Sequence, residues 1–152
     1  MRIMKTAAGK VYLIVILGLA VCALMQTTIL NAKDPVTRPF SCSGQLTIID
    51  LWGGSPLTYI DQGLGSQIGK YVGVGKYPEG EPGWGIYYAA NGDQLFCRDV
   101  GGGVVEWIGG TGQFQGVTGL FTISATSDEF VPGPQGTWNW VINYTGEGTI
   151  TY

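Results

Sequence analysis

The sequence contains no histidine among its 152 residues. Catalytic groups of the Ser-His-Asp and Cys-His types are therefore excluded, because both use an imidazole as the general base. Histidine is also the commonest transition-metal ligand, and the three cysteines of the chain do not complete a zinc site. We therefore expect no metal site and no bound cofactor.

Basic residues are also few, with eight lysines and arginines against 11 acidic side chains. Three of the eight, Arg2, Lys5 and Lys10, lie at the N-terminus, so residues 33–152 carry a net charge of −6. Nucleic acids and anionic lipid surfaces are bound through basic patches, and neither is an expected partner. The acidic balance mainly favours solubility.

The N-terminus has the three-part layout of a secretory signal. Its basic segment is followed by the uncharged apolar run Val11–Met25 and then by a short polar stretch. The small residue Ala32 marks the expected cleavage point, although Leu30 is an unusual residue two positions before it. Residues 1–32 are thus predicted to be a signal peptide, and the protein to be exported, either secreted or periplasmic.

Two other interpretations of this segment compete. Val11–Leu30 is 20 uncharged residues long, which suffices for an uncleaved membrane anchor, although residues 26–28 are polar. Residues 19–22 resemble a lipoprotein cleavage box that would place a lipid on Cys22. Val21 stands where that box has a smaller residue, which argues against the lipoprotein.

Two cysteines lie beyond the predicted signal, Cys42 and Cys97. An even number of cysteines in an oxidising compartment predicts one disulfide, closing a long loop and adding about 3–4 kcal/mol of stability. The alternative is a pair of buried free thiols that act as small apolar residues.

Glycine and aromatic residues dominate the rest of the chain, with 26 glycines, five tryptophans, eight tyrosines and five phenylalanines in the full sequence. Disordered glycine-rich segments lack such bulky side chains, so we expect a folded domain. No window has a helical apolar stripe, and turn signals recur at short intervals. Among them, Asn91-Gly92 is the strongest short-range signal for a β-hairpin.

The pattern predicts an all-β protein, with a single antiparallel β-barrel of about eight strands at residues 42–152. Residues 33–41 form an extended lead-in to it. Glycines inside strands favour a barrel over a sandwich, because bends and bulges help a sheet to close. The expected strands cover residues 41–52, 67–77, 86–90, 94–99, 104–108, 114–125, 137–144 and 149–152.

The segment 109–119, Gly-Gly-Thr-Gly-Gln-Phe-Gln-Gly-Val-Thr-Gly, stands out. It lacks the dinucleotide-binding spacing, and no helix is predicted after it, so we do not expect phosphate binding. We expect a tight turn with a phenylalanine filling the interior and glycines that allow the strand to bend. The residues of this predicted structural turn are Gly110, Thr111, Gly112, Phe114, Gly116 and Gly119.

At these residues the chain resembles the allene oxide cyclase-like barrels, and its first half also resembles the dirigent proteins. The segments 90–93 and 148–152 are similar to small bacterial exported proteins of the same barrel type. The resemblance covers residues 42–152 and implies an eight-stranded antiparallel barrel with a largely apolar interior, often in a homo-oligomer. Characterised members steer cyclisation or radical coupling of hydrophobic molecules. The matching residues are structural, so no catalytic residue is carried over.

Glu106 is the candidate catalytic residue. Strand alternation places Val104, Glu106 and Ile108 on one face of their strand. If that face points inward, Glu106 is a carboxylate in an apolar cavity with a raised pKa, able to act as a general acid or base. The alternative is that this face points outward and Trp107 fills the core.

Five aromatic residues are candidate ligand-binding residues. Tyr59 shares a face with Asp61 if residues 57–61 are extended, and both could then line the barrel mouth; a surface loop is the alternative. Aromatic side chains on one face of the penultimate strand could stack on a ligand or pack the core. The five candidates are Tyr59, Tyr88, Trp138, Trp140 and Tyr144.

The leading functional hypothesis is an exported barrel that binds a small hydrophobic molecule in or at the mouth of the barrel. One alternative is an isomerase or cyclase that acts by confining its substrate, helped by Glu106. The other is a structural surface protein, because a barrel of eight strands can be filled by its own side chains. A cavity of about 300 Å³ or more would separate the first two from the third.

Overall fold

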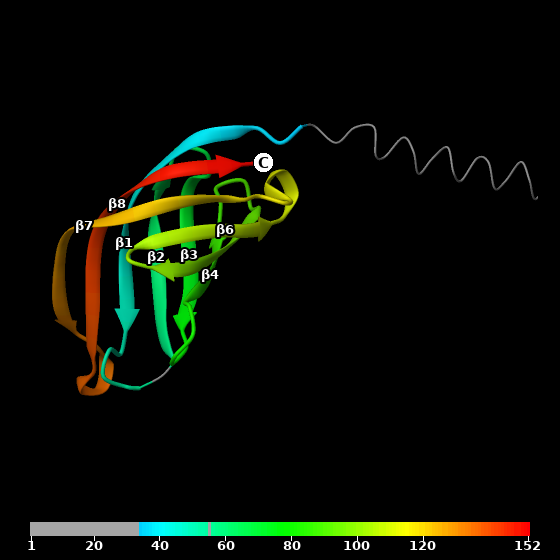
Figure 1. The fold of residues 1–152 in the computed structure, drawn as a ribbon. Helices are drawn as coiled ribbons and strands as arrows, with labels where there is room; N and C mark the ends of the chain where they lie inside the picture. Colours follow the sequence, from blue (N-terminus) through cyan, green and yellow to red (C-terminus); the bar gives the residue numbers. More distant parts are fainter. Residues whose placement is uncertain (1–33, 55) are drawn as a thin grey trace, which may run out of the picture. The chain divides into compact units, whose positions relative to one another are not determined.

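Antiparallel strand pairing forms almost the whole of the structure, a computed structural model that describes residues 34–54 and 56–152 (Figure 1). The predicted signal segment, residues 1–32 with Cys22, lies outside the described residues. Among the described residues, no helix is long and apolar enough to cross a membrane.

Eight strands close into a barrel in which each strand pairs antiparallel with the next and β8 pairs with β1. The predicted closed antiparallel barrel is therefore confirmed. Two short 3₁₀ turns, η1 (Gly112–Phe114) and η2 (Pro134–Gly136), connect β6 to β7 and β7 to β8. The strands are β1 (Thr37–Ile49), β2 (Leu57–Gly65), β3 (Gly69–Tyr77), β4 (Trp84–Tyr88), β5 (Gln94–Gly101), β6 (Val104–Gly110), β7 (Gly119–Pro132) and β8 (Trp138–Thr151).

The structure differs from the predicted strands in two places. One strand was not predicted and another was predicted as two, so the number of strands is eight in both cases. No strand was predicted at β2, and β8 was predicted as two strands of a hairpin, whereas it is continuous. Residues 57–61 were weighed as either an extended segment or a surface loop, and the glycine-containing segment 145–148 was read as a turn. Gly63 and Gly65 in β2, and Gly146 and Gly148 in β8, instead lie within strands on the inner face of the barrel. Strand β1 also begins at Thr37, before the expected start at Ser41.

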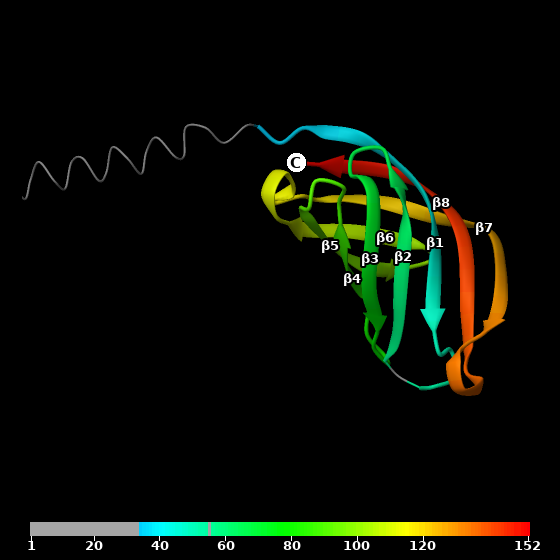
Figure 2. The same ribbon diagram turned by 180° about the vertical axis from the view of Figure 1, so that it is seen from behind.

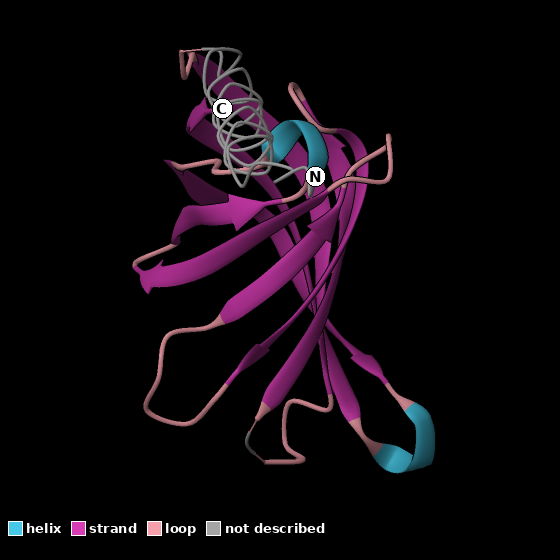
Figure 3. Ribbon diagram, turned by 90° about the vertical axis from the view of Figure 1, so that its right-hand side faces the viewer, coloured by secondary structure: helices cyan, strands magenta, loops and turns pink. Residues whose placement is uncertain are grey.

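One end of the barrel is closed by apolar side chains. Turn η1 lies at this end, and η2 lies at the other (Figure 3). Phe114 in η1 is fully buried, as are Val117 and Ile150 beside it, and Ile68 from the β2–β3 turn is nearly so. Gly112 and Gly116 adopt positive φ angles, 56° and 74°, which shape the turn that carries Phe114 inward.

The other end is open on one side, because β6 and β7 pair over a short stretch. Only Gly119–Thr122 of β7 pair with β6, whereas β7 pairs with β8 as far as Pro132. The β7–β8 hairpin therefore extends beyond β6 (Figures 1 and 2). Ile123, the first residue past this seam, is only partly buried. The interior of the barrel reaches solvent beside it.

Inside the barrel, tyrosine rings lie against glycines. A Cβ atom added to Gly73 would lie 2.9 Å from Cε1 of Tyr87, and one added to Gly44 would lie 2.8 Å from the Tyr71 hydroxyl. The Tyr59 ring lies across Gly75 and Gly85 of the neighbouring strands in the same way. These glycines provide the volume that the rings fill.

The predicted disulfide is wrong, because Cys42 and Cys97 are both buried free thiols. Cys42 is in β1 and Cys97 is in β5, four strands away in the cyclic order of the barrel. Their thiols also have different neighbours, since Cys42 lies beside the Tyr71 hydroxyl and Cys97 beside the Tyr59 hydroxyl. The barrel interior separates the two sulfur atoms.

We predict that Cys42 and Cys97 do not react with iodoacetamide in the folded protein. Both should react once the protein is unfolded, without any reductant being added. Burial raises the pKa of each thiol to about 12, so the folded protein contains almost no thiolate at neutral pH. Peptide mapping by mass spectrometry measures the alkylation of each cysteine. A peptide pair joined through Cys42 and Cys97 would contradict the prediction.

The contact between Tyr59 and Gly85 gives a second prediction. Gly85→Ala places a methyl group against the Tyr59 hydroxyl and should lower the free energy of unfolding by about 1–3 kcal/mol. Tyr59→Phe removes that hydroxyl, so the double variant should recover part of the loss in a double-mutant cycle measured by urea unfolding. Strictly additive effects would show that the two residues do not compete for space.

Candidate functional site

The candidate site is centred on Asp61, a carboxylate inside the barrel. Asp61 lies in the middle of β2, and alternation along this strand turns Tyr59 and Asp61 inward and Ile60 outward. Its side chain is 1% exposed, and it is the only buried charged residue in the described part of the chain.

Tyrosine hydroxyls hold both oxygens of this carboxylate. Tyr87 donates to Oδ2 at 2.8 Å, and Tyr144 reaches Oδ1 at 2.9 Å and Oδ2 at 2.7 Å. The Tyr71 hydroxyl lies 2.5 Å from that of Tyr144. If the single Tyr144 proton is directed at Asp61, the Tyr71 hydroxyl is the donor in its bond with Tyr144, and the Cys42 thiol lies next to Tyr71.

No cationic side chain of residues 34–54 and 56–152 forms an ion pair with Asp61. The ion pair found within the described residues joins Arg98 and Glu106 on the outside of the barrel. Burial raises the pKa of Asp61 from 3.8 to about 6, although the hydrogen bonds from Tyr144, Tyr87 and the Gln62 backbone act in the opposite direction. Burial raises the pKa of all three tyrosines, so they remain protonated donors at neutral pH.

A small, partly open space adjoins Asp61, and its wall includes Ile123, the first residue past the β6–β7 seam; we call this opening the mouth of the barrel. Its volume is about 20 Å³, enough for about one water molecule. Tyrosine rings and apolar side chains form most of its wall, and a second carboxylate, Asp99, lies at its edge. The lining residues are Leu46, Tyr59, Asp61, Tyr77, Gly83, Tyr87, Cys97, Asp99, Val105 and Ile123.

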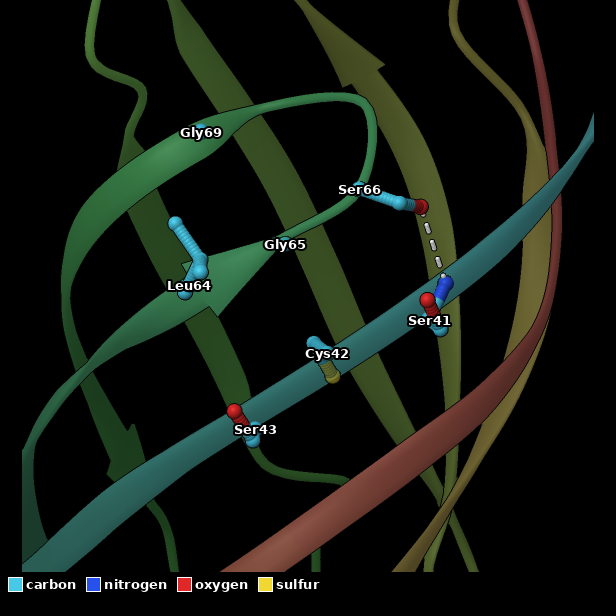
Figure 4. Close-up of a pocket in the computed structure, with 7 residues that line it drawn as sticks. All are labelled: Ser41, Cys42, Ser43, Leu64, Gly65, Ser66 and Gly69. Carbon is cyan, nitrogen blue, oxygen red and sulfur yellow. Dashed lines mark hydrogen bonds between the residues drawn. The ribbon is translucent and has the colours of Figure 1, made fainter.

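Larger hollows on the outer surface are different in kind. One of about 540 Å³ lies between β1 and the β2–β3 turn and is open to solvent (Figure 4). Its side chains are mainly small and polar, and the Ser41 amide donates to Ser66 Oγ at 3.0 Å across it. Such a shallow hollow offers a ligand little apolar contact.

Two of the predicted site residues lie near Asp61. Tyr144 donates to it directly, and Tyr59 lines the same space. Trp140 is half-buried, donates from Nε1 to Asp128 at 2.8 Å and stacks on Phe130. Tyr88 and Trp138 are exposed and do not join this group.

Glu106 lies on the outer face of β6, where it pairs with Arg98. Trp107 and Val105 point into the barrel instead, which is the alternative that the sequence left open. The inward orientation that a catalytic role of Glu106 would require is therefore not found, because Val105 and Trp107 occupy the inner face of β6. The carboxylate in the barrel interior is that of Asp61.

From the sequence, Asp61 was expected to share a strand face with Tyr59, but it was not chosen as a site residue. Tyr71 and Tyr87 were not identified as site residues. A signal was present in β3, where Tyr71, Gly73, Gly75 and Tyr77 alternate on the inner face. Which of these side chains lie near Asp61 depends on the cross-strand register. In that register Asp61 lies opposite Gly73, and Gly73 lies opposite Tyr87. The sequence does not contain that register explicitly.

Comparisons with known proteins give one structural similarity. No protein-family model matches the chain, and no curated protein matches it. The chain is similar in structure to a pterocarpan synthase dirigent protein, with a TM-score of 0.37 and 12% identity over 76% of this chain and 84% of that one. The barrel assignment rests on the strand pairing of the chain itself, and the family resemblance stays a prediction.

The raised pKa of Asp61 predicts a distinct pH dependence. Between about pH 4 and 6, Asp61 keeps its proton in the folded protein and loses it in the unfolded chain, so unfolding releases a proton. Rising pH through this window should therefore lower the contribution of Asp61 to the free energy of unfolding, by about 3 kcal/mol in total.

Urea unfolding of the wild-type protein and of Asp61→Asn, from pH 3.5 to 7, measures this contribution. The free energy of the wild-type protein relative to the variant should fall as pH rises. Asp34→Asn makes the same change on an exposed residue and serves as the control. Parallel curves for the wild-type protein and Asp61→Asn would contradict the assignment.

Proposed function

We propose that this chain is an exported protein that binds a small apolar molecule at the mouth of the barrel, with one polar group of the ligand beside Asp61. The observation that supports this function is the water-sized space next to Asp61, which opens between apolar side chains. A buried carboxylate without a cationic partner lowers stability, and such groups concentrate at functional sites.

The dimensions of the interior determine where a ligand fits. Sites for small molecules usually enclose about 300–1,000 Å³, whereas the space at Asp61 is about 20 Å³. A single functional group fits beside Asp61, so the body of the ligand would lie across the mouth. Leu46, Val105 and Ile123 offer apolar contact there. In an enzymatic version of this function, Asp61 would replace Glu106 as the acid–base group.

The second candidate is a structural barrel. It is favoured by the filling of the interior: the space at Asp61 is about 20 Å³, far below the roughly 300 Å³ expected of an enclosed ligand cavity, and Phe114, Val117, Leu95 and Ile150 are fully buried at the closed end. In this case Asp61 and its tyrosines serve only to fix the packing of the interior, as a fully hydrogen-bonded polar group can.

Methyl NMR of the protein, titrated with small apolar fragments, tests the proposed function. We expect shifts at the methyl groups of Leu46, Val105 and Ile123, and at least a tenfold loss of affinity in Ile123→Glu. Ile60→Glu is the matched control, because Ile60 lies on the outer face. Unchanged spectra with every fragment, in a folded protein, would favour the structural barrel.

A further inference from the structure

The charges around the space at Asp61 all have one sign. Asp61 and Asp99 both contribute to its wall, and none of its ten lining residues is a lysine or an arginine. The only ion pair within the described residues lies outside the barrel and engages neither carboxylate. A ligand group placed here meets a negative charge that no side chain neutralises, which favours a cation and disfavours an anion.

Aromatic rings complete the same wall. Tyr59, Tyr77 and Tyr87 line the space, and the ring centroids of Tyr59 and Tyr77 are 5.3 Å apart. The face of a tyrosine ring attracts cations through its quadrupole, and this attraction strengthens when the cation is removed from water. Carboxylates and aromatic rings together therefore favour a positively charged group with an organic body.

Size and hydrogen-bonding capacity narrow the choice further. The space holds a group of about the size of a water molecule, which fits a primary ammonium group and is too small for a quaternary one. A primary ammonium group has three N–H donors, and each of them needs an acceptor. Asp61 accepts from two tyrosines and the Gln62 amide. Asp99 accepts from the Gly101 amide at 2.7 Å and from the Tyr77 hydroxyl, so each carboxylate, with about four acceptor positions, retains lone-pair capacity.

The position of the opening determines in which direction the rest of a bound ligand can extend. Leu46, Val105 and Ile123 lie on the same wall as Asp61, and the short β6–β7 seam leaves the interior open beside Ile123. An alkyl or aryl chain attached to the ammonium group can therefore extend outward over apolar side chains.

Building on the function proposed above, we infer that the ligand is an apolar primary amine, whose ammonium group lies between Asp61, Asp99 and the tyrosine rings. A neutral alcohol of the same length retains the apolar contact but lacks the charge. A carboxylate of the same length places a negative charge next to Asp61.

Hexylamine, hexanol and hexanoate test this inference at pH 7.5, with affinities measured by methyl NMR on the full chain. Hexylamine should bind at least tenfold more tightly than hexanol, and hexanoate should bind most weakly. Asp61→Asn should remove the preference for the amine while hexanol binding stays unchanged. Asp99→Asn, at a half-buried position, should lower hexylamine affinity severalfold and provides a second variant should Asp61→Asn fail to fold.

Glu106→Gln is the matched control, because it removes a carboxylate from the outer face and should leave the preference for the amine intact. Equal binding of hexylamine and hexanol would overturn the amine inference while leaving apolar binding in place. Hexylamine affinity unchanged in both aspartate variants would also overturn it. Binding of none of the three compounds would overturn the proposed function as well.

Discussion

Tyrosine rings fit inside this barrel because glycines on the neighbouring strands face them. Rings from β2, β3 and β4 lie against glycine positions that leave no room for a Cβ atom. This complementarity fills the interior, and it also brings the hydroxyl groups of Tyr71, Tyr87 and Tyr144 to the centre of the barrel. The glycine content of the chain thus reflects the packing of its core as much as its turns.

The position of Asp61 follows from the same packing. Its carboxylate is held by neutral donors, each fixed by a ring that cannot move without displacing its neighbours. Arg98 and Glu106 show the contrast, since their ion pair lies on the outer surface, where solvent screens it. Inside the barrel the charge of Asp61 is oriented and almost fully buried, and no basic side chain of the described residues forms an ion pair with it. That combination makes this carboxylate the distinctive group of the molecule.

The architecture could be predicted from the sequence, and the site could be predicted only in part. Short strands, the Asn91-Gly92 hairpin and the glycine-rich segment 109–119 lead to a closed all-β barrel. Glycine has two meanings, however, and β8 was divided in two because Gly146 and Gly148, which lie within the strand, resemble a turn. The direction of each strand face was also undetermined, so the orientation of Glu106 was left open between the interior and the surface. Only the register between strands, which no single segment contains, brings Asp61, Tyr87 and Tyr144 together.

The pairing between β1 and β8 also limits how the barrel can form. Thr37–Ile48 of the first strand are paired with residues of the last, from Thr151 back to Trp140. Contacts so distant along the chain are slow to form, because a long loop must close before they are made. The barrel therefore cannot close until β8 is available to pair with β1. During synthesis, the order in which the chain emerges therefore delays closure of the barrel until β8 has formed.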